Sequence, residues 1–238
     1  MSLRQDLEKL TAAALSQAWD VRDGRTVPDT DSVLLAGGAV RLDCTVLYAD
    51  LAESSKLATD FQQRTAAKVV KAFLACMSRL ITAHDGQVTS FDGDRVMGVF
   101  LGGWKNTNAA TCALKMNWTM RAIIRPQLTA YFKSLKKSRF AISHCVGIDT
   151  SNVLVVRAGI RGSNDLVWVG RAPNFAAKLS EIRNAPYRSY VSRDVFRMLK
   201  DSAKYSSDGS RPMWERSSYK FVGTPVTVYR SSWRRPVA

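Results

Sequence analysis

The chain has 238 residues, of which 46% are hydrophobic and 23% are charged, and this ordinary globular composition excludes a wholly disordered chain. It contains no run of about 18 apolar residues, and its first segment, MSLRQDLEKL, carries acids and no apolar stretch. Neither a transmembrane helix nor a secretory signal is therefore expected. The 35 Lys and Arg exceed the 20 Asp and Glu, giving a formal net charge of +15. This excess favours a polyanionic partner, which is nucleic acid, an anionic membrane surface or a phosphorylated small molecule.

The early elements are predicted from apolar spacing and turn residues. We expect a helix over 3–19, a loop over 20–31, a strand over 44–52 and a helix over 54–81 that Ser54 or Ser55 caps. A hairpin follows, with strands over 87–91 and 95–101 around Asp92-Gly93-Asp94, because Asp-Gly between two β-prone runs is a strong hairpin signal.

The later elements follow from the same patterns. We expect helices over 106–124, 127–135, 173–183 and 194–200, strands over 140–148, 152–160, 165–170, 187–192, 219–222 and 226–230, and a frayed tail over 231–238. This order predicts an α+β fold, with one mostly antiparallel sheet and helices largely on one face. We divide the chain into an extension over 1–40, a main domain over 41–230 and a basic tail over 231–238.

The cysteines and histidines carry no chemistry in this interpretation. The four cysteines form no CxxC pair and each lies in an apolar stretch, which predicts buried thiols in a reducing, cytoplasmic compartment rather than a disulfide or a zinc site: Cys44, Cys76, Cys112 and Cys145. His84 and His144 are isolated, and we interpret both as structural residues.

Two acidic residues stand where metal chemistry is favoured. Asp50 ends an apolar strand just before a helix, a position that suits a divalent cation or phosphate, although an ordinary helix cap is the alternative. Asp94 lies in the hairpin turn, where Gly93 permits a positive φ and where acidic residues also serve as simple turn formers. On adjacent strands, the two carboxylates could hold one or two Mg²⁺ ions about 4 Å apart, as two-metal phosphoryl chemistry requires.

Three further polar residues fit a nucleotide. Asn174 and Lys178 are four residues apart on a short helix and share a face, which suits a ribose oxygen and a phosphate that gains charge. Lys220, on a late strand, could hold a terminal phosphate as a point charge. The alternative for the pair is a solvated helix face, and any one of 35 basic residues is easily a bystander.

Five segments in order resemble the class III nucleotidyl cyclases, the catalytic domains of adenylate and guanylate cyclases. The strand motif ends in Ala-Asp at 47–51, and the hairpin Gly-Asp-x-x-Met-x-x-Phe lies within 90–100. A Gly-Ile-x-Thr strand follows at 147–151, the helix motif with its Asn at 170–179, and a Lys…Pro-Val-x-Val-Tyr pattern at 220–229. The resemblance covers about residues 44–230 and implies a ferredoxin-like domain that works as a head-to-tail homodimer.

The resemblance also implies residue roles. Asp50, the Leu51 carbonyl and Asp94 would bind two divalent ions, Mg²⁺ or Mn²⁺. Asn174 of the opposite protomer would orient the ribose, and Lys178 would stabilise the developing charge. The ribose 3′ oxygen would attack the α-phosphorus and expel pyrophosphate, leaving a 3′,5′-cyclic nucleotide.

The departures from the family concern the base. Purine cyclases have Lys where this chain has Ser90, and Asp or Cys where it has Val167, followed by the bulky Trp168. Lys178 replaces the usual Arg, and Phe221 the usual Gly. The pattern resembles the Pycsar pyrimidine cyclases of bacteria, which make cyclic UMP or cyclic CMP as an antiphage signal.

We therefore expect UTP as the substrate, with CTP or a purine nucleotide as alternatives. Tyr48, Ser90, Asp92 and Trp168 are candidates to line the base pocket, and Lys220 to bind phosphate. We expect no membrane or nucleic-acid partner, and a separate effector that binds the cyclic product. The rival hypotheses are a nucleic-acid-binding protein, motivated by the charge and six Trp, and a degenerate cyclase that binds nucleotide without reacting.

Overall fold

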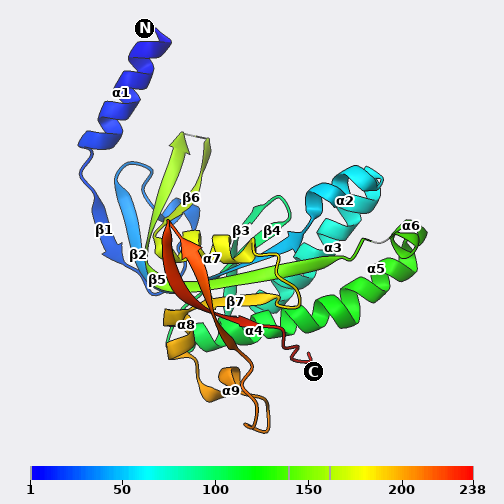
Figure 1. Cartoon of the computed structure of the whole chain (residues 1–238). Coiled ribbons are helices and arrows are strands. Elements are labelled where there is room, and N and C mark those ends of the chain that lie inside the picture. Colours follow the sequence, from blue (N-terminus) through cyan, green and yellow to red (C-terminus); the bar gives the residue numbers. More distant parts are fainter. Residues whose placement is uncertain (1, 139, 161, 238) are drawn as a thin grey trace. The chain divides into compact units, whose positions relative to one another are not determined.

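A computed structural model describes residues 2–138, 140–160 and 162–237 (Figure 1). Met1, Arg139, Arg161 and Ala238 lie outside the described residues. The chain forms two compact units: unit 1 holds the residues up to Leu42 and Asn152–Gly170, and unit 2 holds Asp43–Ser151 and the residues from Arg171 onward. This division does not test the boundaries predicted after residues 40 and 230, which stay predictions. Among the described residues, no helix is both long and apolar enough to cross a membrane.

Unit 1 is built on the ends of two long strands, β2 (Gly38–Ala52) and β5 (Ser143–Ile160), which both continue into unit 2. β1 (Asp20–Asp23) pairs in parallel with the start of β2, and β6 (Ser163–Val169) pairs antiparallel with the end of β5. The helix α1 (Leu3–Ser16) begins with a capping box made by Ser2 and Gln5 and buries none of its residues. A 3₁₀ turn, η1 (Thr30–Ser32), completes the unit. The loop predicted over 20–31 is therefore wrong at β1.

Unit 2 carries most of a mostly antiparallel sheet, as predicted. Its strands run in the order β3-β4-β2-β5-β7-β9-β8; the β3–β4, β4–β2, β7–β9 and β9–β8 pairs are antiparallel, and the β5–β7 pair is parallel. Besides β2 and β5, the strands of this path are β3 (Gly86–Asp92), β4 (Arg95–Phe100), β7 (Ser189–Ser192), β8 (Glu215–Phe221) and β9 (Thr224–Ser231). The hairpin loop between β3 and β4 is Gly93-Asp94, and Gly93 has the positive φ, 60°, expected of it.

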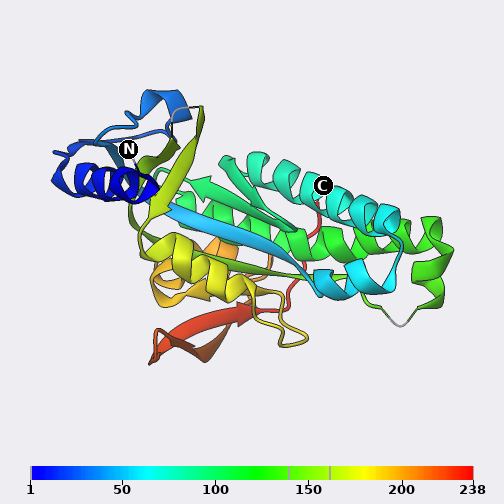
Figure 2. The ribbon, with the colours of Figure 1, turned by 90° about the horizontal axis from the view of Figure 1, so that it is seen from above.

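Helices cover both faces of this sheet, and β2 lies between α3 and α7 in Figure 2. On one face, α3 and α4 bury Phe73, Met77 and Ala113 against Leu47 and other strand residues. On the other, α7 packs its apolar side against β5 and β7. The helices of unit 2 are α2 (Ser54–Asp60), α3 (Gln63–Thr82), α4 (Lys105–Thr119), the π-helix η2 (Met120–Ile124), α5 (Arg125–Tyr131), α6 (Lys133–Lys137), α7 (Arg171–Ser180), α8 (Arg193–Met198) and α9 (Asp201–Lys204).

Several predicted boundaries are wrong for physical reasons. The helix predicted over 54–81 breaks at Phe61, whose backbone is extended, and α2 follows Glu53 in the left-handed conformation, so neither Ser54 nor Ser55 is its cap. The strands predicted over 140–148 and 152–160 form the single strand β5, because the polar segment between them stays in the sheet.

The C-terminal tail is not frayed, in contrast to the prediction. Asn117 Nδ2 donates to the carbonyls of Ser232 and Trp233, at 3.2 and 2.8 Å, and the Arg235 amide donates to the Leu114 carbonyl at 3.1 Å. The described part of the tail is thus fixed along α4.

Candidate active site

The register of three strands gathers the predicted acidic and polar residues on one face of the sheet. Tyr48 and Ser90 both lie opposite Met97 of β4, and Asp50 and Asp92 both lie opposite Arg95, two residues away. Directly paired residues, and residues two apart on a strand, share a face. Tyr48, Asp50, Ser90 and Asp92 therefore face the same side, while the alternate residues of β2 enter the core beneath α3 and α4.

Asp50 is a buried carboxylate held by two arginines. Arg183, just beyond α7, donates from Nη2 to Asp50 Oδ2, and Arg95 Nε lies 3.6 Å from Asp50 Oδ1. Burial raises the pKa of Asp50, Arg183 lowers it, and the nearby charge of Asp94 raises it. The cap of α2 is Glu53, so the alternative of Asp50 as a helix cap is wrong.

Asp94 brings a second carboxylate to the same sheet end. It follows Gly93 in the hairpin loop, and its charge reaches Asp50 across the β2–β4 pair. Its Oδ2 atom is buried and has no hydrogen-bond partner among the described residues. A buried carboxylate oxygen without a donor is costly, and a bound cation would remove that cost.

These two carboxylates fit a divalent cation that completes its shell from other sources. Among the described residues, no group of three or more His, Cys, Asp or Glu could hold a metal ion. Mg²⁺ commonly binds one or two carboxylates and takes its other ligands from substrate phosphate and water. The chemistry of Asp50 and Asp94 fits the protein share of such a site.

The helix α7 presents Asn174 and Lys178 to solvent, as the four-residue spacing predicted. The helix lies directly on β5, because a Cβ at Gly147 would be 2.1 Å from the Ala176 carbonyl oxygen. Arg171 fixes the start of the helix by donating to buried Asp149, with Nε 3.0 Å from Oδ2. Asn174 and Lys178 are exposed between buried neighbours of the same helix.

Lys178 joins the carboxylate site through a chain of charges. Its Nζ lies 3.0 Å from Glu181 Oε2, and Glu181 Oε1 lies 3.4 Å from Nη1 of Arg95, which faces Asp50. The Arg95 guanidinium also lies 5.9 Å from the centre of the Tyr48 ring. Burial raises the pKa of Tyr48, the Arg95 charge lowers it, and the Asp92 charge raises it.

Three predicted residues lie apart from this network. Leu51 is 1% exposed in the core beside α3 and α4. Lys220 is exposed on the edge strand β8, opposite Pro225, and no ion pair joins it to another described residue. Trp168 lies in unit 1, on β6 opposite Val155.

Sequence reasoning missed the cations around Asp50. Arg95 directly follows the hairpin loop and could have been placed opposite Asp50 by pairing the strands. Arg183 is 133 positions from Asp50 and Glu181 is 86 from Arg95, so no local pattern indicates them.

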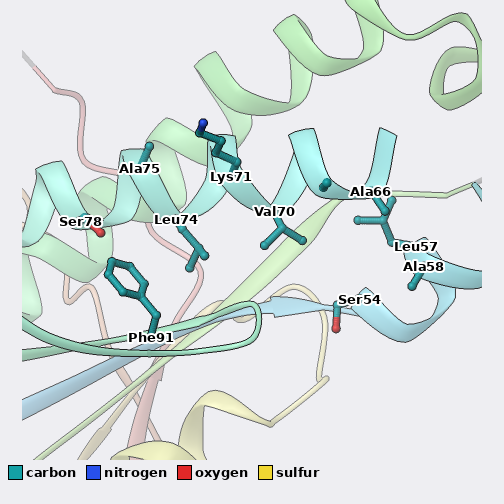
Figure 3. A pocket seen from close by; sticks show the side chains of 11 residues that line it. Ser54, Leu57, Ala58, Ala66, Val70, Lys71, Leu74, Ala75, Ser78 and Phe91 are labelled. Carbon is teal, nitrogen blue, oxygen red and sulfur yellow. The ribbon is translucent and has the colours of Figure 1, made fainter. Parts of the chain in front are cut away.

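An apolar cavity lies beside α2 and α3. It holds about 730 Å³ between α2, α3 and Phe91 of β3, whose ring points toward α3 near Ser78 and Leu74 in Figure 3. Lys71 is its one charged lining residue, and none of the predicted catalytic, metal or substrate residues lines it.

Comparison with known proteins adds close relatives over the full chain, although no family model matches it. A uridylate cyclase of Rhodovulum sp. (strain MB263) is 41% identical over 237 residues, covering 99% of each chain. Those of Xanthomonas perforans and Burkholderia cepacia are 41% and 38% identical, over 98% of this chain and 98% and 99% of the relatives.

Solved structures share the fold. The adenylyl cyclase CyaB from P. aeruginosa matches with a TM-score of 0.67 at 19% identity, over 84% of this chain and 99% of that chain. The guanylyl cyclase Cya2 matches with a TM-score of 0.66 at 19% identity, over 82% of this chain and 94% of that chain. The predicted α+β cyclase fold is confirmed.

Proposed function

The chain belongs to the uridylate cyclase family, and we propose that it converts UTP to 3′,5′-cyclic UMP and pyrophosphate at the sheet face around Asp50 and Asp94. The observation that carries the proposal is the convergence of these two carboxylates at one sheet end, beside Tyr48, Ser90 and Asp92. The reaction joins the ribose 3′ oxygen to the α-phosphorus and breaks the bond from that phosphorus to the bridging oxygen of pyrophosphate.

Asp50 and Asp94 would hold one or two divalent ions, Mg²⁺ or Mn²⁺, with the Leu51 carbonyl as a further ligand. Two features fit such a cation. The Oδ2 atom of Asp94 has no hydrogen-bond donor among the described residues, and both side chains at the site are carboxylates. Bound there, the ions supply positive charge that acidifies a hydroxyl and neutralises a triphosphate. To bind such an ion, Asp50 must release Arg183, because Oδ2 of Asp50 already accepts a hydrogen bond from that guanidinium.

Asn174 and Lys178 would act on the nucleotide held by a partner subunit. Both side chains are exposed on α7, whereas Asp50 is buried. In a symmetric dimer, one protomer could therefore present Asn174 and Lys178 to the carboxylates of the other. Asn174 would orient the ribose, and Lys178 would stabilise the negative charge that grows on the phosphate. A head-to-tail homodimer would then hold two composite sites.

The base would bind beside the β3–β4 hairpin. Tyr48, Ser90 and Asp92 line that sheet face, and we assign them to the pyrimidine. The roles predicted from the sequence for Trp168 at the base and for Lys220 at phosphate remain proposals. Ser90 in place of the family's purine-reading Lys leaves a short hydroxyl at the base position. We further propose that cyclic UMP serves as a second messenger in bacterial antiphage defence and that a separate effector binds it.

The test is the pure protein with each of the four nucleoside triphosphates and Mn²⁺, with the product identified by mass spectrometry. We expect cyclic UMP from UTP at the highest rate. Preferred turnover of CTP, ATP or GTP would overturn the substrate assignment. Nucleotide binding without pyrophosphate release, with Mg²⁺ and with Mn²⁺, would instead support a degenerate cyclase.

A further inference from the structure

A second charged region lies on the other face of the sheet, in a cavity of about 300 Å³ that we call the arginine cavity. It is formed where α4, η2 and α5 meet the start of β5, the loop before β7 and the C-terminal tail. Its lining residues are Asn117, Met120, Arg121, Arg125, His144, Ala185, Pro186, Arg188, Ser232 and Arg234. Four of them are arginines, and none is acidic.

The four arginines have no carboxylate partner. Among the described residues, no ion pair includes Arg121, Arg125, Arg188 or Arg234. Arg125 donates through Nε and Nη2 to the Ile142 carbonyl, at 2.9 and 2.6 Å, which fixes its position without neutralising it. Burial, and then the charges of Arg121 and Arg188, lower the pKa of Arg125. Guanidinium groups that repel one another around one cavity would be stabilised by an anion bound between them.

His144 adds an unpartnered buried group to the same cavity. Its side chain is among those that line the space, the residue is 1% exposed, and neither ring nitrogen has a hydrogen-bond partner among the described residues. Burial, followed by the charges of Arg188, Arg125 and Arg183, lowers its pKa to about 3. A neutral imidazole still offers one N–H to an oxyanion, and a bound anion would offset the surrounding positive charge.

The cavity is distinct from the carboxylate site. His144 packs near Phe73 of α3, with ring centroids 6.3 Å apart, whereas its neighbour Cys145 packs against α7 with Phe175 and Leu179. Neighbouring residues on a strand point to opposite faces. His144 thus faces away from the sheet surface where Asp50 meets Arg183.

We propose that the arginine cavity binds a small phosphate-type oxyanion, held by Arg121, Arg125, Arg188 and Arg234 with an N–H of His144. The volume is at the small end of the range for ligand pockets, which favours inorganic phosphate, pyrophosphate or a phosphate group on a small molecule. Asn117 holds the tail against α4 and so keeps Arg234 at the cavity wall. This site is additional to the nucleotide site and does not depend on the proposed reaction.

The experiment titrates inorganic phosphate and, separately, pyrophosphate into the metal-free full chain by calorimetry in the presence of a chelator. We expect one anion per chain, and a loss of affinity of about tenfold or more in Arg188→Gln and in Arg234→Gln. Arg121→Gln, at an exposed helical position, tests the same cavity with the least risk to folding. Arg216→Gln, exposed on β8, is the matched control and should bind within about twofold of the parent chain.

Nuclear magnetic resonance locates the anion, since the chain has only two histidines. The ring ¹⁵N signals of His144 should shift on binding, while those of His84 should not. Asp94→Asn should bind as the parent chain does, which separates this site from the proposed active site. Absence of saturable binding by both anions, equal weakening by Arg216→Gln, or loss of binding in Asp94→Asn would each overturn the proposal. Tighter phosphate than pyrophosphate would assign a single phosphate group, and the reverse a diphosphate.

Discussion

The carboxylate site and the arginine cavity occupy opposite faces of one sheet and treat charge in opposite ways. Asp50 is buried with two guanidinium groups of its own chain against it, those of Arg183 and Arg95. The cavity beside His144 holds four guanidinium groups and no carboxylate. At the carboxylate site, guanidinium groups of the chain therefore take the place of a bound cation. In the arginine cavity, no carboxylate of the described residues balances the positive charge.

The difference has a thermodynamic consequence. A buried charge without a partner costs several kcal/mol, on the order of the whole stability of a small domain. At Asp50 the arginines offset part of that cost, so a metal ion would bind by exchange with a protein group. In the cavity an anion would displace no protein carboxylate of the described residues, and it should stabilise the fold directly.

The largest effect is expected at Asp94, the acid that has no internal cation. Asp94→Asn should lower the turnover of UTP by about 100-fold or more, because the variant loses a charge needed in the transition state while keeping the side chain's shape. Its melting temperature should not fall, since the variant removes a carboxylate charge whose buried Oδ2 has no hydrogen-bond donor among the described residues. Initial rates and circular dichroism melts measure both quantities. Asp60→Asn, at an exposed position, is the control, and full activity in Asp94→Asn would refute the metal assignment.

The second prediction concerns the exposed groups of α7. Lys178→Ala and Asp94→Asn should each be inactive alone, but a refolded equal mixture should recover about a quarter of the parent activity. Half of the dimers are then mixed, and each mixed dimer keeps one intact composite site of two. If the subunits are shown to exchange and activity still does not recover, Asp94 and Lys178 must act from the same chain.

The sequence predicted the strand and hairpin that carry Asp50 and Asp94, because apolar alternation and an Asp-Gly turn are local signals. It also placed Asn174 and Lys178 on one helical face. It did not predict Arg183 beside Asp50, since that contact joins residues 133 positions apart. The arginine cavity was missed for the same reason, because its arginines come from three separate segments and only the fold brings them together.

The third prediction tests the exchange at Asp50. Arg183→Gln should bind Mn²⁺ about three- to tenfold more tightly without nucleotide, because the carboxylate no longer has to release a guanidinium. Without metal, the variant should be less stable by about 1–3 kcal/mol, since a buried acceptor loses its donor. Electron paramagnetic resonance of free Mn²⁺ and urea unfolding measure the two effects. Arg193→Gln, exposed at the start of α8, is the control. Weaker Mn²⁺ binding in Arg183→Gln would show that Arg183 supports the metal site.

The last prediction concerns the cavity side and depends on pH. His144 has a pKa of about 3 in the folded chain against an ordinary value of 6.5, so between these values the unfolded chain binds a proton that the folded chain does not. The stability contributed by His144 is thus complete above pH 6.5 and is lost as pH falls toward 3. At pH 5 the loss is about 2 kcal/mol relative to pH 7. His144→Leu should remove this part of the slope in urea unfolding, and inorganic phosphate should reduce it in the parent chain, because the anion supports a charged imidazole. Equal slopes in the parent and in His144→Leu would mean that the imidazole does not lie in a buried, electropositive site, and the contrast between the two faces would then reduce to the arginines alone.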